Sequence, residues 1–225
     1  MQATLWGQFI NLAGLPLLCL AISSFLGAFY WQRLSKSLKW LVLFLFFNLF
    51  IEITARFAAV AFRQNLPLLH LYTLGEFWLF SQFYRQILDD QSVFKKYFSP
   101  LITLGLGLVV LNTLLLQSIF EFNSYSKTLV QVIIILYALD YAFRINENTH
   151  PNTVQYQGLR LVNAGVLIYY CGSLFIFMAS KYSNAVGEAF RIFWQTNIIL
   201  NLIFHSVILI ALWKVLNFRP KSSSS

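Results

Sequence analysis

Seven long apolar stretches follow one another along this chain, separated by short polar connections. Each stretch has roughly 19 to 25 residues, and about 20 mostly apolar residues in a helix are enough to cross a bilayer. The pattern therefore predicts an all-α, polytopic membrane protein that forms a seven-transmembrane helix bundle. The expected spans cover about residues 8–30, 40–62, 67–88, 98–117, 126–144, 159–180 and 190–214.

These stretches take up most of the 225 residues, so no separate soluble domain is expected. Residues 1–221 are predicted to form a single seven-helix transmembrane domain, and the serine run 222–225 is predicted to be a flexible tail. Composition agrees, because only 11% of the residues are charged, whereas an ordinary soluble domain has about 25%. Any functional site must then lie inside the bundle or at one of its two ends.

The net charge of +8 does not indicate a nucleic-acid partner, because the basic residues lie near the ends of the spans and form neither a stripe nor a tail. Because the spans alternate in direction, the connections between them lie alternately on the two sides of the membrane, and the two sides have unequal numbers of basic residues. In membrane proteins the short loops with more basic residues are the cytoplasmic ones. The bias predicts an N-terminus outside and a C-terminus inside, in the inner (plasma) membrane of a bacterium. The richer set holds Arg33, Lys36, Lys39, Arg85, Lys95, Lys96, Arg144, Arg160, Lys214, Arg219 and Lys221, and the poorer set holds Arg63, Lys127, Lys181 and Arg191.

Charged residues within a span need a reason, because each costs at least about 2.5–3.5 kcal/mol on insertion scales. Asn48, Glu52 and Arg56 are spaced by four residues and therefore share one face of the second span. Glu76 falls at a similar depth in the third span, so we expect these four residues to form one ligand-binding or structural polar cluster. A Glu52–Arg56 pair can also serve only to fix the helix.

One arginine neutralises one carboxylate, so the other carboxylate of this cluster needs a bound proton or a cationic partner. The cluster Glu52, Arg56 and Glu76 would by itself have one excess negative charge. This charge predicts a preference for a proton or a cationic head-group.

A second polar stripe lies on the last span, where Asn197, Asn201 and His205 are again spaced by four residues. Asp140 and Asn163 fall at about the depth of His205, so we expect the five residues to form a second, inner cluster. Two other roles stay open: the amides can bond neighbouring helices, and Asp140 can pair with Arg144 at the membrane surface. Both polar stripes are expected to face the interior of the bundle, because lipid offers them no hydrogen-bond partner.

The sequence indicates no cofactor and no metal site. It has no paired-histidine motif and no His, Cys, Asp and Glu cluster with ligand spacing. The only lysine of the last span, Lys214, lies at its cytoplasmic edge, which argues against a retinal Schiff base in mid-membrane. No catalytic residue can be named.

Three short motifs resemble those of a known group of proteins. They are the run 71–77 (LYTLGEF) that opens the third span, the run 123–126 (NSYS) before the fifth, and the run 170–175 (YCGSLF) in the sixth. In these the chain resembles uncharacterised seven-span inner-membrane proteins of Bacteroidota. The resemblance covers most of the chain and implies an inner-membrane location, but no activity.

Several classes of function stay open. The favoured class is a sensory or ligand-binding protein of the seven-helix type, whose partners are the lipid bilayer, a lipid or small hydrophobic ligand, and a separate signalling protein. One alternative is an intramembrane lipid-modifying enzyme that uses Glu52, Glu76 or Asp140, but the sequence favours a protein that is not an enzyme. Another is a small-solute transporter, against which the lack of an internal repeat and of a Pro-broken helix pair argues. A structural subunit is the last.

Overall fold

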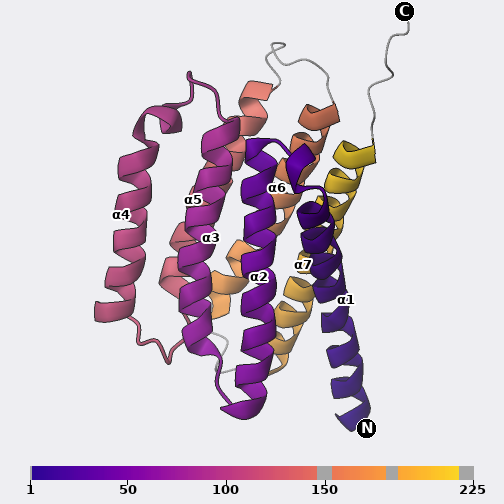
Figure 1. The fold of residues 1–225 in the computed structure, drawn as a ribbon. Helices are drawn as coiled ribbons and strands as arrows, with labels where there is room; N and C mark the ends of the chain where they lie inside the picture. Colours follow the sequence, from indigo (N-terminus) through magenta and orange to yellow (C-terminus); the bar gives the residue numbers. More distant parts are fainter. Residues whose placement is uncertain (1, 146–153, 181–186, 218–225) are drawn as a thin grey trace, which may run out of the picture.

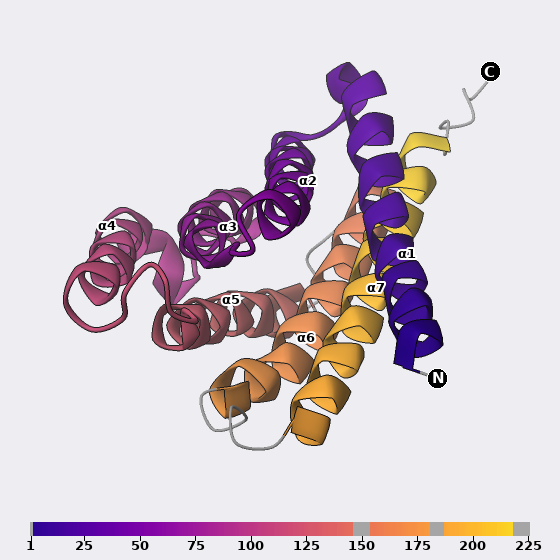
Figure 2. The same cartoon turned by 90° about the horizontal axis from the view of Figure 1, so that it is seen from below.

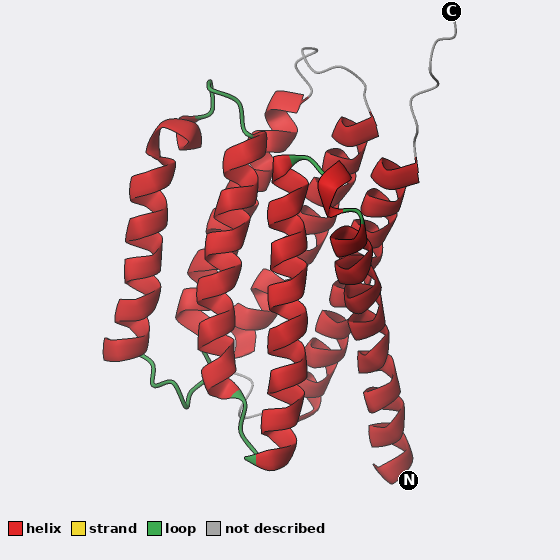
Figure 3. Ribbon diagram, in the orientation of Figure 1, coloured by secondary structure: helices red, strands yellow, loops and turns green. Residues whose placement is uncertain are grey.

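The computed structural model describes the backbone of residues 2–145, 154–180 and 187–217, and the side chains of residues 14–145, 154–178 and 192–217. The tail 222–225 therefore lies outside the described residues, as do Lys181, Arg219 and Lys221. Within the described ranges the chain is all-helical, as predicted, with seven α-helices and one short 3₁₀ turn, Trp31–Arg33 (Figure 3). The helices are α1 (Gln2–Phe29), α2 (Lys36–Ala61), α3 (Leu66–Ile87), α4 (Val93–Leu115), α5 (Ser124–Ile145), α6 (Val154–Ser180) and α7 (Gly187–Asn217).

Each helix corresponds to one of the apolar stretches, with small differences at the ends. The largest is in α1, which begins six residues before its apolar stretch, and α4 and α6 each begin five residues before theirs. In α4 the reason is a cap: the side chain of Ser92 accepts a hydrogen bond from the backbone N–H of Phe94, so a polar first turn precedes the apolar part.

The helices run alternately up and down and form two rows (Figures 1 and 2). One row contains α4, α3 and α2, and the other contains α5, α6 and α7. Helix α1 packs on both α2 and α7 and so closes one side of the bundle, while α3 and α4 each pack on α5 and close the other. Helices α2 and α7, far apart in the sequence, thus lie next to the same neighbour and run in opposite directions.

The closest helix contact is between α6 and α7, and it depends on glycines. Gly158, Gly165 and Gly172 recur every seven residues and so share one face of α6. A Cβ atom at Gly158 would overlap the side chain of Val215. Small residues at such positions let two helices approach closely, which is how helices associate in membranes.

Five of the described helices are long and apolar enough to cross a membrane, namely α2, α4, α5, α6 and α7. The described part of α1, Gly14–Phe29, is apolar but shorter. Helix α3 carries His70 and Glu76, and both side chains are buried against its neighbours. Large apolar side chains such as Phe29, Val60 and Leu115 are exposed on the outside of the bundle, an amount of exposed apolar surface that soluble monomers rarely show.

Candidate ligand-binding cavity

A cavity of about 590 Å³ lies between α1, α2, α3, α6, α7 and the first turn of α5 (Ser124–Ile145), at the end of the bundle where α2 passes into α3. This end faces the viewer in Figure 2. The lining includes the exposed side chains of Arg56, Asn65 and Trp194, so the cavity is open there. Its volume is within the range of about 300–1,000 Å³ that is typical of small-molecule sites.

Helix α2 contributes a row of three polar side chains to the wall. Asn48, Glu52 and Arg56 all line the cavity, as their four-residue spacing on one helix face requires. Arg56 Nε lies 3.7 Å from Glu52 Oε2, and the two side chains are 43% and 40% exposed. The pair is therefore a partly solvated ion pair near the opening, while Asn48 is buried at the inner end of the row.

Helix α7 contributes a second row, formed by Asn197, Asn201 and His205, which also line the cavity. At the inner end the two rows meet, because Asn48 Nδ2 lies 3.4 Å from His205 Nε2. Helices α2 and α7 are antiparallel. Four residues forward along α2 and four residues back along α7 therefore both lead from this bond toward the opening of the cavity. Glu52 and Asn201 therefore lie at one level, and the next level is that of Arg56 with Asn197.

Several polar atoms of the α7 row have no partner among the described residues. Asn197 Oδ1 and His205 Nδ1 are buried without a hydrogen bond, and Asn201 makes none to another described residue. The amide nitrogen of Asn48 can only donate, so His205 Nε2 accepts and Nδ1 of the neutral ring carries the hydrogen. An unpaired buried polar group costs about 1–3 kcal/mol, so this wall is suited to a polar occupant.

A buried ion pair forms part of the opposite wall. Lys127 Nζ lies 2.5 Å from Glu76 Oε2, and the two side chains are 1% and 0% exposed. The hydroxyl of Tyr170 donates to the other carboxylate oxygen at 2.8 Å. Three rings surround the ammonium, with centroids at 4.5 Å (Tyr72), 5.3 Å (Phe177) and 5.9 Å (Tyr170). Lys127 lines the cavity, whereas Glu76 lies behind it.

Lys127 lines the cavity but belongs to neither of the two clusters expected from the sequence. It is the second residue of the expected fifth span, 126–144, and only the charge count groups it with the connections; in the structure it lies in the first turn of α5, which begins at Ser124. The signal in the sequence that could have found it is the need of Glu76 for a cationic partner. Lys127 meets that need because α3 packs directly on α5.

The expected cluster of Glu52, Arg56 and Glu76 is thus two separate ion pairs. Both oxygens of Glu76 are occupied by Lys127 and Tyr170, while Arg56 pairs with Glu52 on its own helix. The excess negative charge inferred from the sequence is also corrected, because Lys127 supplies a second cation. Two carboxylates and two cations leave this part of the bundle neutral.

The expected inner cluster is divided as well. Asn197, Asn201 and His205 line the cavity, but Asp140 and Asn163 do not. Asn163 joins three helices: it accepts from the hydroxyl of Tyr84 at 2.8 Å and donates to the backbone oxygen of Ala138 at 3.1 Å. It lies on the face of α6 that packs on α5, away from α7, so equal depth did not bring it to the cavity.

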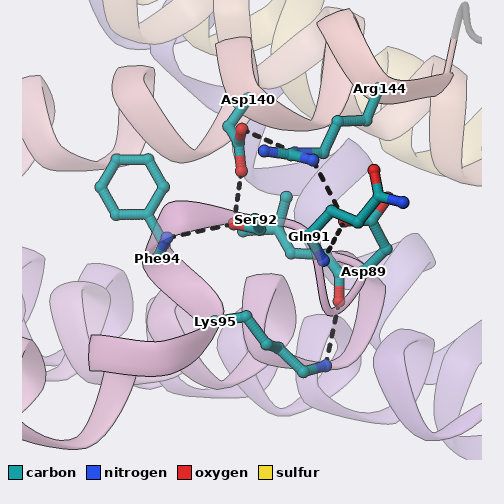
Figure 4. A network of polar contacts seen from close by, with 8 residues as sticks. Asp89, Gln91, Ser92, Phe94, Lys95, Asp140 and Arg144 are labelled. Carbon is teal, nitrogen blue, oxygen red and sulfur yellow. Dashed lines mark hydrogen bonds and ion pairs between the residues drawn. The ribbon is translucent and has the colours of Figure 1, made fainter.

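Asp140 belongs to a polar network at the far end of α3 (Figure 4). It accepts from Arg144 Nε at 2.8 Å and from Ser92 Oγ at 2.5 Å, and Arg144 also lies 3.4 Å from Asp89. These contacts tie α5 to the connection between α3 and α4. The alternative of an Asp140–Arg144 ion pair is therefore the arrangement that the structure has.

Beyond the Asn48–His205 bond the bundle is filled by packed rings, which we call the aromatic floor: Phe44, Phe80, Phe204 and Tyr170. Phe44 follows Asn48 one turn deeper in α2, and its ring centroid lies 4.4 Å from that of Phe80 and 6.4 Å from that of Phe204. All four side chains are at most 2% exposed. None of the four lines the cavity, so the cavity ends before the aromatic floor.

Comparison with known proteins adds no family. No family model, no curated protein and no solved structure matches this chain. Across the described residues, no three His, Cys, Asp or Glu side chains come together in a group that could hold a metal ion. A function is therefore inferred from the geometry of the cavity.

Proposed function

We propose that this protein is an integral membrane protein of the ligand-binding, sensory type, which binds a small molecule in the cavity and acts through a separate signalling protein. The observation that carries this proposal is a cavity that is open at one end, closed by the aromatic floor and lined by two facing polar rows. Concave, largely apolar sites with a few convergent polar groups are the usual form of small-molecule sites.

In the proposed arrangement all seven helices span the bacterial inner membrane, with the N-terminus outside and the C-terminus inside. The basic side chains support it. Arg63 is the one basic residue in the described connections at the cavity end, because Lys127 is inside the bundle. The cavity would then open to the outer side of the membrane. At the other end lie Arg33, Lys36, Lys39, Arg85, Lys95, Lys96, Arg144, Arg160 and Lys214.

The geometry favours binding over the two alternative classes. A transporter needs a site that can be reached in turn from both sides, and the aromatic floor separates this cavity from the far end. A hydrolase that uses carboxylates needs them to converge on a substrate. Of the three carboxylates only Glu52 lines the cavity, since Glu76 lies behind Lys127 and Asp140 lies at the other end.

The proposal is tested by native mass spectrometry of the protein purified in a mild detergent. We expect a bound small molecule on the wild type that is lost when the cavity is filled. Ala55 lines the cavity, so Ala55→Phe places a ring inside it. Ala164 is exposed on the outside of α6, so Ala164→Phe adds the same ring elsewhere and serves as the control. Equal adducts on the wild type and Ala55→Phe, or no adduct on the wild type, would overturn the proposal.

A further inference from the structure

The charges around the cavity are already balanced. Glu52 is paired with Arg56, and Glu76 with Lys127, so two carboxylates face two cations. An additional charge from a ligand would have no counter-charge here, and an uncompensated charge in a low-dielectric interior is costly. Charge balance therefore favours an uncharged ligand.

Of the Lys127–Glu76 pair only Lys127 is among the residues that line the cavity, and its side chain is 1% exposed. A lysine ammonium has three N–H donors, and among the described residues Lys127 makes one hydrogen bond, to Glu76. The surrounding rings of Tyr72 and Phe177 accept no conventional hydrogen bond. Lys127 therefore has N–H donors without a hydrogen-bond partner among the described residues, at the wall of the cavity.

The remaining walls are of two kinds. On one side Asn197 and Asn201 offer amide groups without partners among the described residues. On the α1 side the wall is apolar, formed by Pro16, Leu17 and Leu20. Asn197 and His205 are eight residues apart, which is about 12 Å along a helix, so the polar wall is elongated. A molecule that matches both walls is amphiphilic and extended.

We propose that the cavity binds an uncharged amphiphile, whose oxygen atoms accept hydrogen bonds from Lys127 and bond the amide of Asn201, while its alkyl part lies against α1. This inference rests on the proposed ligand-binding function and specifies its ligand. Neutral esters and alcohols with an alkyl chain belong to this class, and fatty acids and alkylammonium compounds do not.

Three probes that share one alkyl chain separate these classes: monodecanoylglycerol is neutral, decanoate is an anion and decyltrimethylammonium is a cation. Each is added at the same concentration to the purified protein, and the bound fraction is measured by native mass spectrometry. Wild type and variants are compared for each probe, so that attachment through the detergent cancels. We expect monodecanoylglycerol to show the largest difference in bound fraction between the wild type and the variants.

Two variants report on the proposed contacts. Asn201→Leu removes an amide that bonds no described residue, so the fold is retained. Lys127→Met combined with Glu76→Gln removes both charges together and leaves no unpaired carboxylate. Each is expected to weaken binding of monodecanoylglycerol about fivefold or more, the effect of one lost hydrogen bond. Thr196→Val is the control, because Thr196 is exposed on α7 and bonds only the backbone of its own helix.

Stronger variant-sensitive binding of decanoate or decyltrimethylammonium would overturn the inference and leave the proposed function intact. A second result would also overturn the inference but not the proposed function. In that case no probe binds differently to Asn201→Leu and Thr196→Val, while the wild type still carries a bound molecule that Ala55→Phe loses. If that native molecule is absent too, the ligand-binding function itself fails.

Discussion

Lys127 and Glu76, on neighbouring helices α5 and α3, form an ion pair of 2.5 Å in which neither side chain reaches solvent. Breaking such a pair by removing one partner typically costs about 3–5 kcal/mol, because the other charge is left buried and alone. Removing both charges costs much less. The pair therefore couples the two helices through charge, and this coupling can be measured.

We expect Lys127→Met to lower the stability of the protein by about 3–5 kcal/mol, and Lys127→Met with Glu76→Gln to recover most of the loss. The measurement is thermal unfolding of the variants in one detergent. In the double variant the hydroxyl of Tyr170 can still donate to the amide oxygen of the new glutamine. Equal melting of the single and double variants would show that the two side chains are not coupled.

Glu52→Gln provides the contrast. The Glu52–Arg56 pair joins two residues of one helix at 3.7 Å, and both side chains are about 40% exposed. Pairs of this kind contribute about 0–1 kcal/mol. The same unfolding measurement should therefore find Glu52→Gln close to the wild type, and a loss as large as that of Lys127→Met would contradict the separation into two ion pairs.

The buried amides fall into two groups that mutation should distinguish. Asn163 bonds Tyr84 and the backbone of Ala138, so Asn163→Leu leaves the buried hydroxyl of Tyr84 without its partner and should cost about 1–3 kcal/mol. Asn201 bonds no described residue, so Asn201→Leu should cost nothing measurable. Both variants are compared by thermal unfolding. A large loss for Asn201→Leu would indicate a structural role for this amide.

The glycine contact between α6 and α7 should not accept a larger residue. At Gly158 an added Cβ would overlap Val215 Cγ2, so Gly158→Ala is expected to cost about 1–3 kcal/mol through overpacking. Adding Val215→Ala should restore part of the loss by making room. Gly107 of α4 has no atom within 4 Å of the added Cβ, so Gly107→Ala should be neutral or stabilising. If unfolding temperatures show no rescue by Val215→Ala, the contact is looser than described.

The proposed orientation is checked with reporter fusions in a bacterium. Alkaline phosphatase is active only outside the inner membrane, and a fluorescent protein folds inside. A fusion after Asn217, at the end of α7, should be fluorescent and have no phosphatase activity, and a fusion after Asn65, between α2 and α3, should show the reverse. Active phosphatase after Asn217 would mean that the number of spans or the orientation is wrong.

The helices could be predicted from the sequence because each is marked by a long apolar run. The residues that share one helix face were also predictable, because the four-residue spacing of Asn48, Glu52 and Arg56 places them on one side of the helix. The spacing of residues within one helix does not indicate which other helix lies next to it. That the rows of α2 and α7 meet at Asn48 and His205 follows from the packing of α1 on both of these helices.

The site residues that the sequence misplaces show the same limit. Asp140 and Asn163 lie on faces that turn toward other helices, so equal depth along the membrane groups them with residues that they do not touch. Lys127 is misplaced for a different reason. It lies at the very start of the expected fifth span, where a basic residue is typical of the membrane surface, and its pairing with Glu76 makes it part of the interior.

The aromatic floor has an electrical consequence for a protein in an energised membrane. In the proposed orientation, water or a polar ligand in the cavity would carry the potential of the outer solution inward as far as the Asn48–His205 bond. The membrane voltage then falls mainly across the remaining part of the bundle, where 100 mV is worth about 2.3 kcal/mol for each charge that crosses it. The rings of Phe44, Phe80 and Phe204 offer no hydrogen bonds along which a proton could pass. If the proposed orientation holds, a cell can therefore keep this cavity open to its surroundings without discharging its own proton gradient.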